Sequence, residues 1–406
     1  MSARPDPAQV SDAVLAHCRR HAYAGHDPFD GLNSRLFRYT GLSKLPFASI
    51  AWLQAHKRSP FNFRQVLGVP RMRNPKGVAL IVLGLLEREQ RTGDGASLGE
   101  ARALGDWLLE QRVDRRRWRH SAWGYHFDWA ARAFFVPVGT PNAISTCYVA
   151  RALYALGSAT GEARFTDVAI DAGHFLDSLY LPHQGSGYFA YIPGERAFVH
   201  NANLWSAAFV AETGLRTGDT SMRERAMAAA RLTVSMQRED GAWAYGLRDH
   251  HGFVDGFHTG YNLEALQRLQ HTCGTQVFAK SIDLGLDYYR DTFFLSDGTV
   301  KYYDDTIWPL DMHSVAQALI TLLTVSTSKA DYALAMRVFE RAVETLYMPE
   351  KGRFVYQRSA RFTNRIDYLR WTQAWSFYSI ALLANRACAA NTANFASARL
   401  PEREII

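Results

Sequence analysis

The sequence predicts an all-α protein in which six helical hairpins close into an (α/α)6 toroid, with an inner and an outer ring of helices. Three observations support this fold class: a short motif that recurs at nearly constant spacing, an alternation of apolar and amphipathic segments between its copies, and a core-forming composition. The chain has 406 residues, of which 48% are hydrophobic and 21% charged. These values are typical of a folded globular protein.

The recurring motif reads Gly-x-aromatic-x-Tyr. It is exact at residues 241–245 (GAWAY) and 352–356 (GRFVY), loose at 187–191 (GYFAY) and degraded at 298–302 (GTVKY). The closing tyrosines fall at positions 191, 245, 302 and 356, which are 54, 57 and 54 residues apart. Such internal repetition indicates one supersecondary unit that is built several times.

Two helical segments lie between successive copies of the motif. The first is apolar on nearly every side, as expected of a buried inner helix, and occurs at residues 77–87, 143–156, 204–215, 260–269, 314–325 and 372–384. The second is amphipathic, as expected of an outer helix, and occurs at residues 98–111, 165–179, 222–236, 277–289 and 331–346. A sixth outer helix is needed, and we expect residues 7–20 to supply it beside the last inner helix.

Residues 22–75 are the least regular part of the chain. They contain Pro28, Pro46, Pro60 and Pro70, and one short helix is expected near residues 47–56. We expect this segment to form a cap or rim on the ring. No stretch has the composition of a linker, so residues 1–406 are predicted to be one domain.

Several features bear on location and partners. No apolar run approaches the roughly 20 residues of a spanning helix, and the first 13 residues lack the apolar core of a secretion signal. The four cysteines are widely separated and form no CxxC pair, which favours a reducing, cytoplasmic compartment. The net charge of +7 favours anionic partners, and no nucleic-acid-binding fingerprint is present.

The candidate site lies in the loops that lead into the inner helices, whose N-termini should ring one mouth of the toroid. Histidine can act as a general acid or base, and carboxyl groups in pairs can hydrolyse glycosides. The residues expected to be catalytic are Asp255, His258, Tyr261 and Asp304. Those expected to bind substrate are Arg73, Asp128, Asn142, Asn201, Asn203, Trp205, Trp243, Asn262, Asp305, His313, Arg370 and Trp371.

For any one of these residues, a helix cap or a hydrogen bond within a polar loop is the competing interpretation. The set of Asn201, His258, Tyr261 and Arg73 matches, by residue type, the groups that some toroid lyases use on uronate polymers. The stretch 249–262 is rich in histidine but has no known metal-ligand motif, so no metal and no cofactor are predicted.

Several segments resemble known families. Residues 237–243 (QREDGAW) match the Q-x-x-D-G-x-W repeat of squalene–hopene cyclases and prenyltransferase subunits. Residues 23–33, 123–142 and 253–266 resemble the α/α-toroid proteins of bacterial exopolysaccharide and lipopolysaccharide biosynthesis. Six-hairpin glycosidases, polysaccharide lyases and uronyl epimerases are more distantly similar. Residues 304–306 (DDT) also resemble the end of the D-x-D-D-T motif of terpene cyclases, with Tyr302 in place of the first aspartate.

The resemblance implies a carbohydrate-active enzyme of surface-polysaccharide biosynthesis that acts by hydrolysis, uronate elimination or epimerisation. The cations expected at the rim are Arg71, Arg73, Lys76 and Arg370. They favour an acidic glycan or glycolipid intermediate, so an acidic polysaccharide or a lipid-linked oligosaccharide is the expected partner. Peripheral association with an anionic membrane is the other explanation of these charges. A terpenoid cyclase-like enzyme, which requires an apolar aromatic cavity, and a non-catalytic glycan-binding scaffold are the alternative functions.

Overall fold

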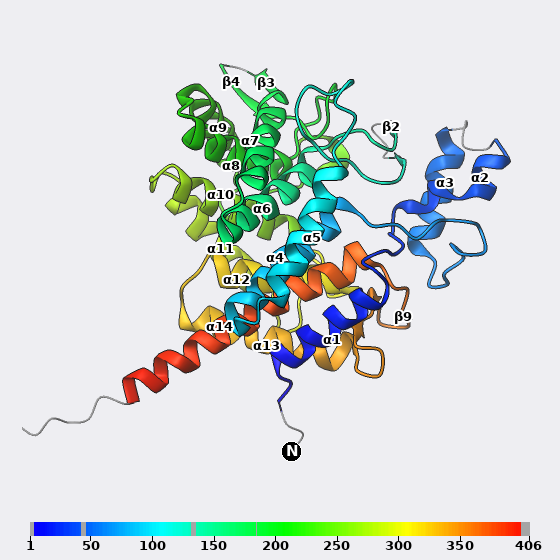
Figure 1. The fold of residues 1–406 in the computed structure, drawn as a ribbon, viewed down its shortest axis with the longest axis vertical. Helices are drawn as coiled ribbons and strands as arrows, with labels where there is room; N and C mark the ends of the chain where they lie inside the picture. The colour runs from blue at the N-terminus through cyan, green and yellow to red at the C-terminus, as the bar shows by residue number, and fades with distance from the viewer. Residues whose placement is uncertain (1–3, 42–45, 131–134, 184, 399–406) are drawn as a thin grey trace, which may run out of the picture.

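The computed structural model describes residues 4–41, 46–130, 135–183 and 185–398, and it confirms the all-α toroid (Figure 1). The inner helices of this described part are α4 (Pro75–Thr92), α6 (Ala143–Thr160), α8 (His200–Thr217), α10 (Gly256–Thr272), α12 (Met312–Thr324) and α14 (Ala374–Ala398). Each packs against the next, and α14 packs against α4, so the inner ring is closed. The all-apolar segments of the sequence became these helices because they are surrounded on every side.

An outer helix packs on each inner one. The outer helices are α5 (Ala96–Glu110), α7 (Ala163–Asp177), α9 (Thr220–Val234), α11 (Ala279–Phe293), α13 (Lys329–Leu346) and α1 (Pro7–Arg20). As expected, α1 packs against α14, so the two ends of the chain form the sixth hairpin. Figure 1 shows α1, in dark blue, near the start of the red α14.

The glycine of the repeated motif is required by its backbone conformation and by close packing. Gly241, Gly298 and Gly352 have φ values of 95°, 86° and 61°, a region that side chains strongly disfavour. A Cβ at Gly241 or Gly298 would lie 2.4 or 2.5 Å from a carbonyl oxygen of the next outer helix, α11 or α13. At Gly352 the nearest atom is the carbonyl oxygen of Ala13, in α1, at 3.1 Å. The glycine of this last copy thus packs against α1, as the glycines of the other two copies pack against the next outer helix of the ring.

The tyrosine of the motif anchors each loop over an inner helix. The carbonyl oxygens of Tyr191, Tyr245, Tyr302 and Tyr356 accept hydrogen bonds of 2.8, 3.3, 3.0 and 3.3 Å from the first backbone N–H of α6, α8, α10 and α12. The first N–H groups of a helix have no partner within the helix, so these bonds satisfy one of them. All four loops consequently end at the same mouth of the ring.

Short antiparallel strands brace the loops. They are β1 (Trp129–Ala130) with β2 (Phe135–Val136), β3 (Tyr180–His183) with β4 (Ser186–Phe189), β6 (Tyr347–Met348) with β7 (Arg353–Phe354), and a three-stranded set of β5 (Leu310–Asp311), β8 (Gln357–Arg358) and β9 (Thr363–Asn364). No helix among the described residues is long and apolar enough to span a bilayer.

Residues 22–75 contain more helix than expected. The short helix η1 (Asp30–Asn33) is followed by α2 (Arg35–Tyr39) and α3 (Pro46–Arg58), where one helix was predicted. The extra helix α2 begins at Ser34, whose hydroxyl accepts a hydrogen bond of 3.1 Å from the backbone N–H of Phe37. Figure 1 shows α2 and α3 together at one side of the molecule. Residues 42–45 of this segment, and residues 131–134 of the segment 123–142, lie outside the described residues. The single domain remains a prediction.

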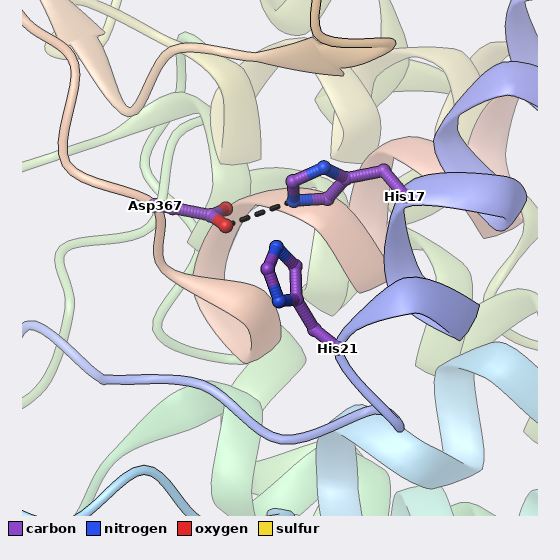
Figure 2. Close-up of side chains that lie close together, drawn as sticks. All are labelled: His17, His21 and Asp367. Carbon is purple, nitrogen blue, oxygen red and sulfur yellow. Dashed lines mark hydrogen bonds and ion pairs between the residues drawn. The ribbon is translucent and has the colours of Figure 1, made fainter.

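The sixth hairpin is also held by a polar contact. His17 in α1 forms a hydrogen bond of 2.8 Å through Nε2 with the carboxylate of Asp367, which precedes α14 (Figure 2). Figure 2 shows His21, which caps the C-terminal end of α1, beside the same carboxylate. This contact joins residues that are 350 positions apart, at the point where the ring closes.

Candidate active site

A cavity of about 270 Å³ opens at the mouth where the inner helices begin. The N-terminal end of every inner helix supplies at least one lining residue. These residues include Lys76 (α4), Ile144 (α6), Asn201 (α8), His258 (α10), His313 (α12), and Trp371 in the π-helical turn η4 (Leu369–Gln373) that leads into α14. Phe29 and Lys57, from residues 22–75, also line it. A cavity at the convergence of six helix ends is a common form of small-molecule site.

Tyrosines of the loops form much of the cavity wall. Tyr125, Tyr191, Tyr245 and Tyr302 all line the cavity, and the hydroxyls of Tyr125 and Tyr191 lie 2.8 Å apart. Burial raises the pKa of each of these four phenols, so each keeps its proton at neutral pH. Aromatic faces beside hydroxyl donors suit a sugar ring, which presents both C–H groups and hydroxyls.

Asp255 and His258 form a dyad on α10. One carboxylate oxygen of Asp255 accepts the backbone N–H of His258 at 2.8 Å, which caps the helix, and the other contacts His258 Nδ1 at 2.7 Å. Asp255 is buried, whereas the His258 side chain is 21% exposed and lines the cavity. Because the carboxylate fixes a proton on Nδ1, Nε2 is the nitrogen left to accept one. The arrangement is that of a general base held in one orientation.

Tyr261 and His313 form a second pair on the same wall. Tyr261 lies one turn beyond His258, and its hydroxyl shares a hydrogen bond with His313 Nε2. Burial raises the pKa of Tyr261 well above its usual value, and burial followed by the charge of Lys76 lowers the pKa of His313 well below its own. Both groups are therefore uncharged at neutral pH. The His258 and Tyr261 rings lie 5.8 Å apart between centroids, so a proton acceptor and a proton donor border one space.

Two cationic side chains lie deep in the cavity. Lys76 is 4% exposed, and its Nζ lies 4.3 Å from the ring centroid of Tyr148 and 5.1 Å from that of Trp375. Burial lowers the pKa of Lys76 well below its usual value. Arg370, in η4, is buried but already paired, since its Nε and Nη2 donate to the two carboxylate oxygens of Asp27 at 2.5 and 2.8 Å.

Seven of the sequence-predicted site residues line this cavity: Asn201, Asp255, His258, Tyr261, His313, Arg370 and Trp371. Asn201 lies on α8, with its side-chain oxygen buried and without a hydrogen-bond partner. A buried polar atom without a partner in a cavity marks a position at which a ligand group can bind.

Five other predicted residues have positions within the packed helices rather than on the cavity. The side chain of Asn142 caps α6 by accepting the N–H of Ser145 at 2.8 Å, Asn203 bonds to the loop at Phe189, and Trp243 donates to a carbonyl of α9. Trp205 and Asn262 are buried and are absent from the lining. These residues shape the ring behind the site.

Four predicted residues have other partners or are exposed, and they do not line the cavity. Arg73 donates to the carbonyl oxygen of residue 22 at 2.7 Å, and Asp128 pairs with Arg38 at 2.9 Å. Asp304 accepts a hydrogen bond of 3.3 Å from the hydroxyl of Tyr288, and Asp305 is exposed. They lie in the expected loops, but a loop position alone does not determine the direction of a side chain.

The prediction counted Lys76 among the cations at the rim but gave it no role in the site, and it left out the tyrosines of the loops. The tyrosines had a clear signal, because three of them close copies of the repeated motif and all copies lead to one mouth. Tyr125 belongs to a further copy, residues 121–125 (SAWGY), in which serine replaces the glycine. Its tryptophan, Trp123, donates to a carbonyl of α5 at 2.8 Å as Trp243 does to α9. The burial of Lys76 had no comparable signal, because a lysine beside a helix start is usually exposed.

No group of three metal-ligating side chains occurs in the cavity among the described residues. The cluster of histidines at 249–262 does not converge: His258 faces the cavity, whereas His250 and His251 are absent from its lining. In the part of the chain that the structure describes, the one group of this kind is His17, His21 and Asp367, in the sixth hairpin, whose ligand-type atoms lie within 4.8 Å of one another.

Comparison with known proteins supports the fold. No protein-family model and no curated sequence matches the chain. An unsaturated glucuronyl hydrolase specific for heparin aligns with a TM-score of 0.64 and 11% identity, over 94% of this chain and 97% of that one. A cellobiose 2-epimerase from Bacillus thermoamylovorans aligns with a TM-score of 0.60 and 10% identity, over 78% and 88%. An α-mannanase of Bacteroides thetaiotaomicron aligns with a TM-score of 0.59 and 10% identity, over 80% of this chain and 90% of that one. The chain therefore has the six-hairpin toroid fold that these carbohydrate-active enzymes share, as the sequence predicted.

Proposed function

We propose that this cavity transfers protons to and from a carbon atom of a saccharide, in an epimerisation or a β-elimination. His258 Nε2 removes a proton from a carbon next to a carbonyl or carboxylate group, and Tyr261 is the acid. The observation that carries the proposal is the pair of proton-transfer groups on one wall, each oriented by a buried partner, Asp255 or His313. Proton removal from carbon needs such a base held against the substrate.

The two reactions differ in where the protons go. In an elimination, His258 takes the proton, the bond to the β-oxygen breaks as the new C=C bond forms, and Tyr261 protonates the departing oxygen. In an epimerisation, a proton taken from one face is replaced by one delivered to the other. His313, hydrogen-bonded to Tyr261, is the group through which Tyr261 regains its proton.

Hydrolysis is less well supported. Glycosidases generally use two carboxyl groups that flank the scissile bond. Among the described residues that line the cavity, Asp255 is the one carboxylate, and both of its oxygens are engaged by His258. This arrangement supports proton transfer at carbon rather than displacement at a glycosidic centre.

The proposed substrate is an acidic glycan. Lys57, Lys76 and Arg370 give the cavity a basic lining, and carbohydrate-active toroids are the structural neighbours. The sequence resemblance extends the proposal to surface-polysaccharide biosynthesis in the cytoplasm, with a lipid-linked oligosaccharide as a form of the substrate and with peripheral membrane association. These finer points rest on the sequence alone.

The cyclase alternative has less support. Its proton donor would come from the DDT segment, but Asp304 and Asp305 are absent from the cavity lining. The aromatic wall suits a carbocation, whereas a positive charge on Lys76 would repel one. A glycan-binding scaffold would use the same wall without turnover.

The test is product analysis with uronate-containing and neutral oligosaccharides. Ultraviolet absorbance of a new C=C bond conjugated to a carboxylate reports elimination, NMR reports inverted configuration, and reducing-sugar release reports hydrolysis. We expect one of the first two products, and none from His258→Gln. Reducing-sugar release without the other products would contradict the proposal, and binding without any product would favour the scaffold.

A further inference from the structure

We propose that Lys76 is the carboxylate-binding residue of this site, and that it receives the carboxylate of a uronate. This inference rests on the proposed function and deepens it, because it specifies where the acidic group binds. Arg73, another of the cations that the sequence places at the rim, donates to the carbonyl oxygen of residue 22 and does not line the cavity.

Lys76 is a buried amine with no anionic partner. It is 4% exposed and lines the cavity, and the ring centroids of Tyr148, Trp375 and Tyr261 lie 4.3, 5.1 and 5.4 Å from Nζ. No carboxylate in the described part of the chain forms an ion pair with it. Aromatic faces stabilise an ammonium only weakly, and a buried charge needs a hydrogen-bonding counter-charge. A ligand carboxylate would supply one.

The other cations of the cavity are less available. The guanidinium of Arg370 is held by both carboxylate oxygens of Asp27, which leaves little of its charge for a ligand. Lys57, on α3, lies only partly buried, with its Nζ 4.9 Å from the ring centroid of Phe29. Lys76 is therefore the deep cation that a ligand can pair with.

Carboxylate binding at Lys76 would be accompanied by proton uptake. Burial, and then the nearby charge of Arg370, lowers the pKa of Lys76, so the ammonium form is less favoured in the free site than on an exposed lysine. An anion at Nζ favours the ammonium and raises the pKa again. The titratable or charged groups around Lys76 are Cys147 and Tyr148 of α6, Tyr261 of α10, His313 of α12, Arg370 of η4, and Asp27. Of these, Asp27 is negative, and it is already paired with Arg370.

The position of Lys76 also suits the chemistry. Its Nζ lies beside the Tyr261 ring, and His258 lies next to that ring, at 5.8 Å between centroids. A carboxylate neutralised by Lys76 withdraws electrons from the adjacent carbon and stabilises the carbanion that proton removal creates. The same contact therefore binds the substrate and makes its C–H bond more acidic.

The test is calorimetric binding of a glucuronate-containing trisaccharide and of the matched neutral trisaccharide. The proteins are wild type, Lys76→Met and Lys57→Met; methionine keeps the length of the side chain and suits an aromatic cage. We expect Lys76→Met to bind the acidic trisaccharide about 30-fold or more weakly and the neutral one unchanged, since losing one partner of a buried charge pair has effects of this size. Lys57→Met should have a much smaller effect.

A second readout does not depend on the variant. Repeating the wild-type titration in buffers with different ionisation enthalpies measures the protons taken up, and we expect net uptake with the acidic trisaccharide only. Equal binding of both trisaccharides by wild type, or no net uptake, would overturn the role of Lys76 and leave a glycan site intact. Failure of wild type to bind either trisaccharide would contradict the glycan function as well.

A separate observation points to a metal site in the sixth hairpin. We infer that His17, His21 and Asp367 bind a divalent cation of the zinc type (Figure 2). The histidines are four residues apart, His17 within α1 and His21 at the residue that caps its C-terminal end, and the carboxylate approaches from the segment before α14. Two imidazoles and one carboxylate, with donor atoms within 4.8 Å, are a ligand set that zinc accepts, with water as the fourth ligand.

The surroundings of this group resemble those of a metal site. Gln373 Nε2 donates a hydrogen bond of 3.0 Å to the second carboxylate oxygen of Asp367, which fixes the orientation of the carboxylate. His17 is buried, whereas His21 and Asp367 are partly exposed and leave a route for an ion. A bound ion would join α1 to the start of α14 and strengthen the closure of the ring.

The test is thermal unfolding of protein treated with EDTA and then titrated with zinc. We expect the midpoint to rise with zinc concentration, and His21→Ala to abolish the rise. His120→Ala is the control, because His120 also pairs with an aspartate, Asp171, at 2.8 Å but belongs to no three-ligand group in the described chain. An absent rise in wild type, or an unchanged rise in His21→Ala, would overturn the site.

Discussion

Replacing Asp255 with asparagine separates the two roles of this carboxylate. One oxygen caps α10 and the other orients His258. Asparagine keeps an oxygen for the cap, and asparagine and aspartate are nearly equal as helix caps. The free energy of unfolding should therefore fall by less than about 1 kcal/mol. Asp255→Ala removes the cap as well and should lose about 1–2 kcal/mol.

The expected loss of activity is much larger. In Asp255→Asn the oxygen that caps the helix is kept, so an amide N–H replaces the carboxylate oxygen that contacts His258 Nδ1. An N–H donor there favours the tautomer that carries its proton on Nε2, which is the nitrogen that must be free to accept one. The general-base contribution to turnover is about 10²–10⁴-fold, and the wrong tautomer forfeits it. In free energy this is about 3–5 kcal/mol added to the barrier.

The assay pairs turnover with thermal and denaturant unfolding of the same preparations. Asp219→Asn is the matched control: Asp219 caps the outer helix α9 through the backbone N–H of Ser221 at 2.9 Å, outside the cavity. It should leave both activity and stability nearly unchanged. Near-normal turnover of Asp255→Asn would refute the dyad, and unfolding of this variant would show that the carboxylate is chiefly structural.

Three further predictions test the ring and the cavity. Gly241→Ala should lower the free energy of unfolding by at least about 2 kcal/mol, because φ is 95° and the new Cβ would lie 2.4 Å from a carbonyl oxygen. Its control is Gly139→Ala, where φ is 78° but the space is open, and the loss should be only about 1 kcal/mol. Equal losses in denaturant unfolding would contradict the packing argument. Asp27→Asn should lower the free energy of unfolding by about 3–5 kcal/mol, since it leaves Arg370 buried without its counter-charge. A decrease of less than about 1 kcal/mol in urea unfolding would show that the arginine finds another partner. Because burial lowers the pKa of Lys76, the amine loses its charge at a lower pH than an exposed lysine does, so uronate affinity in wild type should rise as the pH falls. The same slope in Lys76→Met would assign the pH dependence to another group.

The ring could be predicted because its determinants are periodic. Buried inner helices are apolar on every side, outer helices carry one stripe, and each turn repeats the same glycine and tyrosine. The need for a sixth outer helix followed from counting, and α1 occupies that place. The helix α2 was missed because it is only five residues long and depends on a single serine cap.

The site could be predicted only in part, because side-chain direction decides it. Asn201 and Asn203 are two positions apart on α8, and two helical steps turn a side chain to nearly the opposite side. Asn201 accordingly faces the cavity, whereas Asn203 bonds to Ala229 behind it. Asp304 lies in a loop, where no periodicity gives the direction of a side chain. The burial of Lys76 depends on the assembled ring and not on its neighbours in sequence.

The most direct test of the central claim is solvent isotope exchange. Wild-type protein is incubated in D2O with uronate-containing oligosaccharides, beside His258→Gln and the control Asp219→Asn, which lies outside the cavity. Deuterium on sugar carbons is followed by NMR and mass spectrometry. Proton removal by His258 predicts that deuterium enters the carbon next to the carboxylate in recovered substrate or in epimerised product, or that this carbon loses its hydrogen in an eliminated product. This should occur with wild type and Asp219→Asn but not with His258→Gln. Turnover of the saccharide with every carbon-bound hydrogen retained, or an equal rate of exchange in His258→Gln, would contradict it.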